Sequence, residues 1–308
     1  MPAKILSRMD TQSIKWLRWA FNCKLWKPTA AEWLQANRCI QGEEMQRIER
    51  FVFQSPAISA MVGRLLLRKS VQTVTHLENK SIHFLRTSEG RPYLKDVNDL
   101  DVNVSHHGDW VVLALERNHQ VGIDVMSLNR PINISIEEYF HLMRRQFTLS
   151  EWEQIKSADN SLHEFYRFWC LKESYVKATG VGLNLDLQKI SFKVKEKLSA
   201  DCFVISTEMR LDGSVEASDW LFEEKLLDSN HCVAVCTNPS PSSLSVSAVG
   251  SSTAQPQENY DSLRTNHRKQ QKSFTVIPTS DLLSLETINF NVGVDAWNNF
   301  NNKTFSSR

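Results

Sequence analysis

The sequence predicts an α+β protein made of two similar halves. Each half offers a strand, then helices, then further strands, and a short E-x-x-x-I echo occurs in both, at residues 44–48 and 151–155. A chain of 308 residues, 41% of them hydrophobic, is long enough to build two modest domains. The echo is too short to prove a repeat. Together the observations favour an internal pseudo-dimer with its ligand cleft between the halves.

Composition sets the expected limits of the two halves and of a tail. We expect the first half at residues 1–118, the second at 119–238 and a tail at 239–308. The tail begins PSPSSLSVSAVGSSTAQPQ, which is rich in Ser and Pro and poor in aromatics, so it is expected to be mostly disordered. Residues 274–285 regain apolar character and predict a strand and short helix that dock back. The Asn-rich end after Asn289 is again expected to be disordered.

Composition also argues against several classes of function. A net charge of +1 argues against a nucleic-acid-binding surface, which needs clustered Lys and Arg. No run approaches the roughly 18–20 apolar residues of a membrane helix. The six cysteines are scattered without C-x-x-C spacing, as is typical of buried thiols in a reducing compartment. We therefore expect a cytosolic protein that binds neither nucleic acid nor membrane.

Two patterns weakly indicate other features, a cleaved leader and a zinc site. Basic residues near the N-terminus faintly resemble a transit peptide, but residues 16–21 already have a strand pattern. His231, Cys232 and Cys236 approach a zinc motif, but valines alternate with them as in a strand. We expect neither a cleaved leader nor a zinc site.

Local patterns place the first elements in order. Residues 15–21 (KWLRWAF) predict a strand, and Thr29 begins a helix. Residues 43–53 (EEMQRIERFVF) are amphipathic, and after a proline a second helix runs on from Ala57. These helices carry basic side chains, most of them expected to be solvated: Arg47, Arg64, Arg68 and Lys69.

Strand patterns follow the helices. Residues 83–86 and the region of Tyr93 predict two strands joined by the turn T-S-E-G-R-P. Residues 101–116 (DVNVSHHGDWVVLALE) alternate, and a polar turn at 117–120 leads into VGIDVM at 121–126. Two apolar runs around a four-residue polar turn predict a hairpin.

The second half returns to helices. Beyond Pro131 the segments EEYFHLMRRQF and SEWEQIK are helical, the latter starting near Thr148 or Ser150. Residues 165–182 (FYRFWCLKESYVKATGVG) form a helix with apolar residues all round, which indicates burial, and Gly180 is placed to end it. Four strand candidates follow: LQKISFKV, CFVISTEMRL, DWLFEEKLL and HCVAVCT.

Beyond Arg167, the buried helix carries three charges, Lys172, Glu173 and Lys177. Charges on a buried helix need partners, which a bound ion or phosphate could supply. The alternative is an ordinary surface pair between Glu173 and Lys177. However, the run W-C-L-K-E-S-Y-V-K from Trp169 to Lys177 resembles W-x-x-K-E-[SA]-x-x-K, the long and specific signature of the phosphopantetheinyl transferases.

Asp124 in VGIDVM adds a second carboxylate. A lone Asp at a strand end is usually a turn or cap residue. About fifty residues before K-E-S-x-x-K, it matches the G-[IV]-D half of the same family signature. KWLRWAF, RFVF, the R-T-x-x-G-[KR]-P turn and the N-x-S-H segment also look like animal members of the family. The resemblance covers most of residues 14–238.

The resemblance implies the family's fold and reaction. Its members transfer the 4′-phosphopantetheine arm of coenzyme A to a serine of apo acyl, peptidyl or aminoadipate carrier domains, with Mg2+, and release adenosine 3′,5′-bisphosphate. The implied partners are coenzyme A and the carrier domains of fatty acid synthase and of aminoadipate-semialdehyde dehydrogenase-like proteins. A pseudo-dimer within one chain also implies a monomer.

Asp124 and Glu173 are the expected Mg2+ ligands, because a hard cation prefers carboxylate oxygens. Glu173 is also the expected base for the carrier serine, directly or through a water. Lys177, one turn on, is expected over the phosphates, and Lys172 beside it. Met126 stands where bacterial members carry a third acid, and a thioether is a poor ligand for Mg2+, so two protein carboxylates are expected.

Further residues match the family's coenzyme-binding positions. Arg86, Arg91 and His106 have donors suited to phosphate. Glu89 departs from animal members, which tend to carry lysine there, and an acid would repel phosphate. Gly90 is expected to contribute turn geometry. The whole expected set is Arg47, Arg86, Thr87, Ser88, Glu89, Gly90, Arg91, Asn103, Val104, Ser105, His106, Asp124, Glu173 and Lys177.

Two rival functions belong to other classes. A catalytically silent coenzyme A-binding regulator would keep the fold but lack Asp124 or Glu173, and both are present. A scaffold that recruits partners through its Ser-rich tail rests on tail composition alone.

Overall fold

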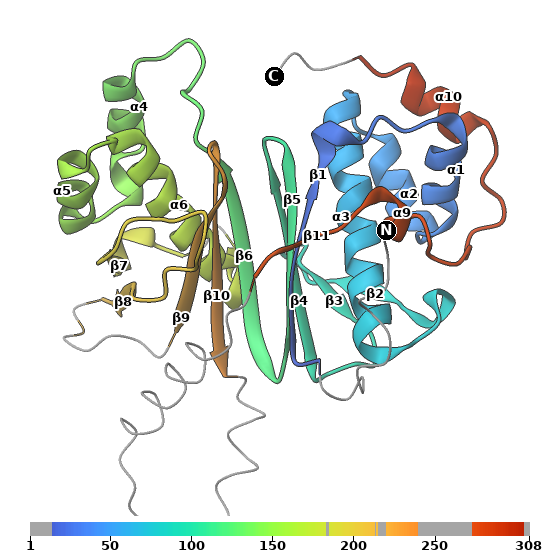
Figure 1. Cartoon of the computed structure of the whole chain (residues 1–308), viewed down its shortest axis with the longest axis horizontal. Coiled ribbons are helices and arrows are strands. Elements are labelled where there is room, and N and C mark those ends of the chain that lie inside the picture. The colour runs from blue at the N-terminus through green and yellow to red at the C-terminus, as the bar shows by residue number, and fades with distance from the viewer. Residues whose placement is uncertain (1–13, 183–184, 213, 215–219, 240–272, 305–308) are drawn as a thin grey trace, which may run out of the picture.

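The computed structural model describes residues 14–182, 185–212, 214, 220–239 and 273–304. It is an α+β structure in which two halves lie side by side (Figure 1). In each half one long helix packs against a sheet. These helices are α3 (Gln54–Thr75) and α6 (Ser161–Thr179). The predicted fold class is therefore confirmed.

The first sheet has the strand order β11-β1-β5-β4. Strands β1 (Trp16–Asn22), β5 (Trp110–Arg117) and β4 (Leu100–His107) are antiparallel neighbours. The short β11 (Thr275–Val276) runs parallel to β1. Because strand side chains alternate between faces, one set of apolar residues meets α3 and forms the first hydrophobic core.

Helix α3 packs on this sheet, and two shorter helices pack against α3. Thr29 caps α1 (Ala30–Arg38) in a capping box with Glu32, as its position predicts. Helix α2 (Gly42–Glu49) stops earlier than the predicted amphipathic stretch. Pro56 does not precede the next helix but lies in the first turn of α3, where a missing N–H leaves no hydrogen bond unmade.

Arg68 on α3 is buried, contrary to the expectation that it is solvated. It is only 3% exposed, and its guanidinium donates to Asn79 Oδ1 at 2.6 Å and to the carbonyl of Ile82 at 3.1 Å. This arginine anchors the segment that leads to the hairpin of β2 (Phe84–Arg86) and β3 (Pro92–Leu94).

The second sheet has the order β6-β10-β9 and is antiparallel throughout. Its strands are β6 (His119–Ser127), β9 (Leu221–Asp228) and β10 (His231–Pro239). Helix α6 packs on it and ends at Gly180, whose φ of 71° is the predicted left-handed cap. The smaller elements of this half are α4 (Ile136–Leu142), α5 (Leu149–Ser157), β7 (Ile190–Lys193) and β8 (Glu208–Leu211).

The hairpin predicted between residues 101–116 and 121–126 is wrong. Gly108, with a φ of 58°, divides the first stretch into β4 and β5, which pair with each other. Strand β6 pairs with β10 in the other sheet instead. A local pattern of apolar runs around a turn does not say which strands bond.

Side chains join the two sheets where β4 lies beside β6. Alternate residues of β4 accept hydrogen bonds from backbone N–H groups of β6, so that the strands are tied without a backbone ladder. The bonded pairs are Asp101 with Val121 at 2.9 Å, Asn103 with Ile123 at 3.0 Å and His107 with Ser127 at 2.7 Å.

An apolar cluster and a buried ion triad also hold the halves together. Valines and alanines of β5, β6 and β10 pack between the sheets. Arg18 of β1 is 1% exposed and donates to Glu116 at 2.5 Å and to Glu223 at 2.8 Å. Burial lowers the pKa of Arg18, but Glu223 and Glu116 outweigh it and raise that pKa. The triad spans both halves, since Glu223 lies on β9.

The C-terminal segment completes the first half. Besides β11 it forms α9 (Thr279–Leu282) and α10 (Asp295–Asn301). The predicted docking of residues 274–285 is confirmed, because Ile277 and Leu282 belong to the first core. The expected disorder after Asn289 is wrong at α10. Its Phe300 stacks on Trp33 with ring centroids 3.9 Å apart.

Some expectations lie outside the described residues, namely the leader at residues 1–13 and the Ser/Pro-rich stretch at 240–272. The domain limits at 118 and 238 stay predictions. Within the described ranges, no helix is long and apolar enough to cross a membrane.

The cysteines and the zinc-like pattern lie mostly in the interior. His231 Nδ1 lies 2.9 Å from Asp228 Oδ1, and Cys232 and Cys236 are buried in the second core. The part of the chain that the structure describes contains no cluster of three metal-ligating residues. Cys202 is an exposed thiol, against the expectation for all six.

Candidate active site

Asp124 lies at the centre of the candidate site. Alternation along β6 turns its side chain toward α6, and the residue is only 5% exposed. Its Oδ1 accepts from Ser105 Oγ at 2.8 Å and from Lys177 Nζ at 2.6 Å. Its Oδ2 is buried and has no hydrogen-bond partner among the described residues. A buried carboxylate oxygen in that state calls for a ligand.

Gly122 brings α6 close to this carboxylate. A Cβ on Gly122 would lie 2.9 Å from the Cα of Ala178, and closer still to the carbonyl oxygen of Ser174. The helix backbone therefore rests directly on the strand two residues before Asp124. The glycine of G-I-D lets α6 bring Glu173 and Lys177 to the acid.

Glu173 forms an acidic pair with Asp124. Burial raises the pKa of Glu173, the charge of Asp124 raises it further, and Lys177 partly offsets both. Two like charges held together in protein are relieved by a cation. The donor set is carboxylate oxygen, which suits a hard divalent ion such as Mg2+, and the orphaned Oδ2 supplies a free ligand atom.

The segment from Asn103 to His106 divides between structure and site. Ser105 bonds Asp124, whereas Asn103 is engaged with the backbone of β6. Val104 packs with the first core. His106 is exposed, yet desolvation and the nearby charges of Lys177 and Arg64 lower its pKa. A neutral imidazole can still donate one hydrogen bond to phosphate.

Several arginines gather around Glu44 of α2. Arg86 binds its carboxylate at 2.9 Å, and Arg64 of α3 forms a second ion pair with it. Burial lowers the pKa of Arg64, against the effect of Glu44, and Arg86 and Arg47 lower it further. Two guanidinium groups therefore share one carboxylate, and the charge of Arg47 acts on one of them, which leaves positive charge for an anion.

Arg64 was not selected from the sequence, where it was expected to be solvated. Its side chain is 20% exposed and paired with Glu44. The available signal was its position in the run R-L-L-L-R, because an arginine flanking a buried apolar stretch of a helix needs a partner.

Arg91 acts as a clamp between elements. Nη1 donates to the carbonyls of Lys177 and Ala178, at 2.5 and 2.7 Å, where α6 ends. Nη2 donates to both carboxylate oxygens of Asp101, at 2.7 and 2.6 Å, and to the carbonyl of Val121 at 3.0 Å. Both terminal nitrogens are thus engaged by protein. Its contact with coenzyme A stays a prediction, and these bonds favour a structural role.

The rest of the predicted nucleotide turn lies between β2 and β3. The N–H of Gly90 donates to the carbonyl of Thr87 at 2.9 Å, and Gly90 has a φ of 88°, as a tight turn requires. Ser88 Oγ donates to the exposed Glu89 at 2.6 Å, which lowers the pKa of that acid. Glu89 therefore remains an anion within the predicted nucleotide turn.

Lys172 is not part of the site, contrary to expectation. It is fully buried on another side of α6, where Nζ pairs with Glu151 at 2.9 Å and donates to the carbonyls of Leu187 and Ile190. Burial lowers its pKa, and Glu151 counteracts that shift. Lys172 therefore anchors α6 to α5 and β7.

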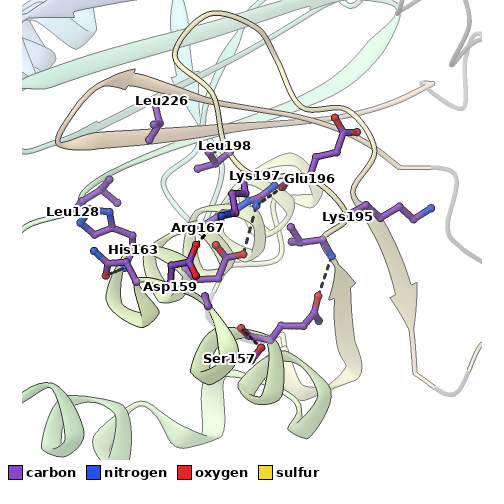
Figure 2. A pocket seen from close by; sticks show the side chains of 15 residues that line it. Leu128, Ser157, Asp159, His163, Arg167, Lys195, Glu196, Lys197, Leu198 and Leu226 are labelled. Atoms are coloured by element: carbon purple, nitrogen blue, oxygen red, sulfur yellow. Dashed lines mark hydrogen bonds and ion pairs between the residues drawn. The ribbon is translucent and has the colours of Figure 1, made fainter.

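A polar cavity of about 510 Å3 lies near the beginning of α6 (Figure 2). Its basic side chains are already paired, Arg167 with Glu224, Lys197 with Asp159 and Lys195 with Glu208. Arg167 and His163 on its wall precede Glu173 by about 1.7 and 2.8 turns of helix, which places the cavity away from the carboxylate pair. It adds no group to the candidate site.

Comparisons with known proteins agree with this geometry. Residues 24–118 match the family "4'-phosphopantetheinyl transferase, N-terminal", and residues 120–236 match the "4'-phosphopantetheinyl transferase superfamily". The L-aminoadipate-semialdehyde dehydrogenase-phosphopantetheinyl transferase of Homo sapiens is 40% identical over 88% of this chain and 86% of its own. The Xenopus laevis protein of that name is 45% identical over 71% and 75%. The 4'-phosphopantetheinyl transferase of Bacillus subtilis is 30% identical over 51% and 67%.

Proposed function

This chain belongs to the 4′-phosphopantetheinyl transferase family, and on that premise we propose that it moves the phosphopantetheine arm of coenzyme A to a serine of apo carrier domains, with Mg2+. The orphaned Oδ2 of Asp124, beside Glu173 and Lys177, is the observation that supports the proposal most. Acyl and aminoadipate carriers, including those of fatty acid synthase, are the proposed acceptors. Both carboxylates come from one chain, which supports a monomer, and we propose that it works in the cytosol, where free thiols are typical.

The proposed reaction is an attack of the carrier serine Oγ on the phosphorus that bears the pantetheine arm. The bond to adenosine 3′,5′-bisphosphate breaks, and the serine proton passes to Glu173, directly or through water. The raised pKa of Glu173 favours that role, because a base works best when its pKa lies near the operating pH. Mg2+ held by Asp124 and Glu173 would supply positive charge to the reacting phosphates.

The surrounding residues bind and orient. Lys177 holds Asp124 in place through its 2.6 Å ion pair and brings a cation to the phosphates. The cluster of Arg47, Arg64 and Arg86 offers charge for the nucleotide end of coenzyme A. No observation favours a silent regulator, because both carboxylates are in place.

The test is to weigh an apo carrier domain after incubation with the protein, coenzyme A and Mg2+. The expected result is a gain of one phosphopantetheine mass. In the Glu173→Gln variant we expect coenzyme A affinity within roughly tenfold of wild type and turnover lower by about two orders of magnitude or more. An unmodified carrier with wild-type protein would refute the activity. Normal turnover of the variant would remove Glu173 from the mechanism.

A further inference from the structure

A second cavity, of about 640 Å3, opens where the two halves and the C-terminal segment meet. Its walls come from the segment after β1, the start of α3, the turn between β4 and β5, and α10. The residues that matter below are Trp26, Ile58, Gly108, Phe300 and Asn301.

The cavity and the phosphate-binding groups lie on the same two elements. On α3, Ile58 in the cavity wall precedes Arg64 by six residues, about 9 Å along the helix. On β4, Ser105 bonds Asp124, and Gly108 in the cavity wall follows three residues later, about 10 Å along the strand. Both elements therefore run from the charged groups to the cavity.

This order matches the order of groups in coenzyme A. Its nucleotide phosphates suit the arginines around Glu44, and its reacting pyrophosphate suits the carboxylate pair. The pantetheine arm leaves the pyrophosphate on the side away from the nucleotide. With the nucleotide at Arg64 and Arg86, the arm leads toward the cavity.

The chemistry of the lining fits the arm. Pantetheine is a chain of methyl and methylene groups interrupted by two amides. The cavity presents apolar surface from Trp26, Ile58 and Phe300, which are 4%, 7% and 4% exposed. Trp26 Nε1 is a buried donor without an acceptor in the described part of the chain. An amide carbonyl is the acceptor that such an indole lacks.

We infer that this cavity holds the pantetheine arm of coenzyme A and determines how tightly that part of the donor is bound. The inference rests on the proposed function. It assigns a binding role to α10, because Phe300 and Asn301 form part of the wall.

The test compares two probes by titration calorimetry: coenzyme A and adenosine 3′,5′-bisphosphate, which lacks the arm. Asn301→Trp adds bulk to the cavity wall from an exposed position, so the packing of the core is left intact. The control is Asn302→Trp, because Asn302 is also exposed and is not among the residues that line the cavity. We expect Asn301→Trp to weaken coenzyme A about fivefold or more and to leave the bisphosphate within about twofold. The control should change neither.

Ile58→Trp fills the cavity from its inner wall and should weaken coenzyme A about tenfold with the same selectivity. Wild-type affinity for coenzyme A in both variants would overturn the inference, and so would equal losses for both probes. Carrier modification by wild-type protein is measured separately. If modification occurs while the variants bind normally, the cavity assignment fails and the proposed function stands. If the variants lose coenzyme A binding selectively but wild-type protein does not modify the carrier, the cavity assignment stands and the proposed function fails.

Discussion

Gly122 of β6 lies against the backbone of Ser174 on α6 so closely that no side chain fits between them. The contact sets the separation between strand and helix just where Asp124, Glu173 and Lys177 converge. The glycine of the G-I-D motif thus has a steric reason that is separate from the chemistry of the acid beside it.

Gly122→Ala should therefore disturb both stability and the site. A methyl group placed against helix backbone forces α6 away, at a cost of about 1–3 kcal/mol in the free energy of unfolding. Transfer activity should fall with it. The control is Gly42→Ala, where a Cβ meets nothing within 4 Å, so stability should change by only about 0.5 kcal/mol. Denaturant titration measures the free energy of unfolding of both variants. If Gly122→Ala is as stable as Gly42→Ala, the steric role of Gly122 is refuted.

Asp124→Asn should raise the Mg2+ needed for half-maximal activity by about an order of magnitude or more, because one of only two carboxylates is lost. Met126→Ala is the matched change on the same strand. Its side chain packs beside the second core and is not expected to bind the ion, so the Mg2+ requirement should stay unchanged. A titration of activity against Mg2+ separates the two. Similar shifts in both variants would contradict a two-carboxylate site.

Arg91→Ala should lower stability by about 2 kcal/mol or more, because charge-assisted bonds to α6 and to Asp101 are lost together. Lysine should not restore it, since an ammonium lacks the fork that reaches both partners. Thermal unfolding of Arg91→Ala and Arg91→Lys tests this. Wild-type stability of either variant would argue that Arg91 is free to bind coenzyme A.

Arg86→Ala should act differently. Arg64 remains to pair with Glu44, so the fold is retained. The Michaelis constant for coenzyme A should rise more than the maximal rate falls, because a nucleotide contact is equal in the ground and transition states. Steady-state kinetics give the answer. A fall in maximal rate alone would move Arg86 to the reacting centre.

Phe300→Ala should cost about 3 kcal/mol of stability, because a stacked and buried ring is removed from the first core. A chain ending at residue 238 loses this ring together with β11 and should be less soluble than the full chain. The measurement is the unfolding free energy of Phe300→Ala, with Phe290→Ala as control, since Phe290 is 82% exposed. Equal unfolding free energies for Phe300→Ala and Phe290→Ala would mean that the C-terminal segment contributes little to stability.

Local sequence patterns predicted the elements well, because caps and periodicity act within a few residues. Thr29, Thr148 and Gly180 mark helix ends where expected. The two motifs also pointed to Asp124 and Glu173, which the fold brings near each other, while their roles in binding and catalysis stay predictions. Pairing between distant segments was harder to predict, since the apolar run of β6 says nothing about whether β5 or β10 will bond it.

The roles of charged residues were harder still. Arg91 and Lys172 have the chemistry of phosphate ligands, and only their surroundings show that carbonyls and carboxylates of the fold already engage them. Arg64 is the converse, an arginine that looked solvated and joins the cationic cluster through Glu44. The charge of a side chain follows from the residue type alone, whereas its partner depends on segments that are distant in the sequence.

The parallel pairing of β11 with β1 also orders events during biosynthesis. The first strand is made before the whole second half, whereas its outer neighbour and the aromatic ring that covers Trp33 are made after it. At bacterial or eukaryotic elongation rates that gap is on the order of tens of seconds. During it the amino-terminal half has an open sheet edge beside β1 and an uncovered Trp33, while the carboxy-terminal half already has every strand of its β6-β10-β9 sheet.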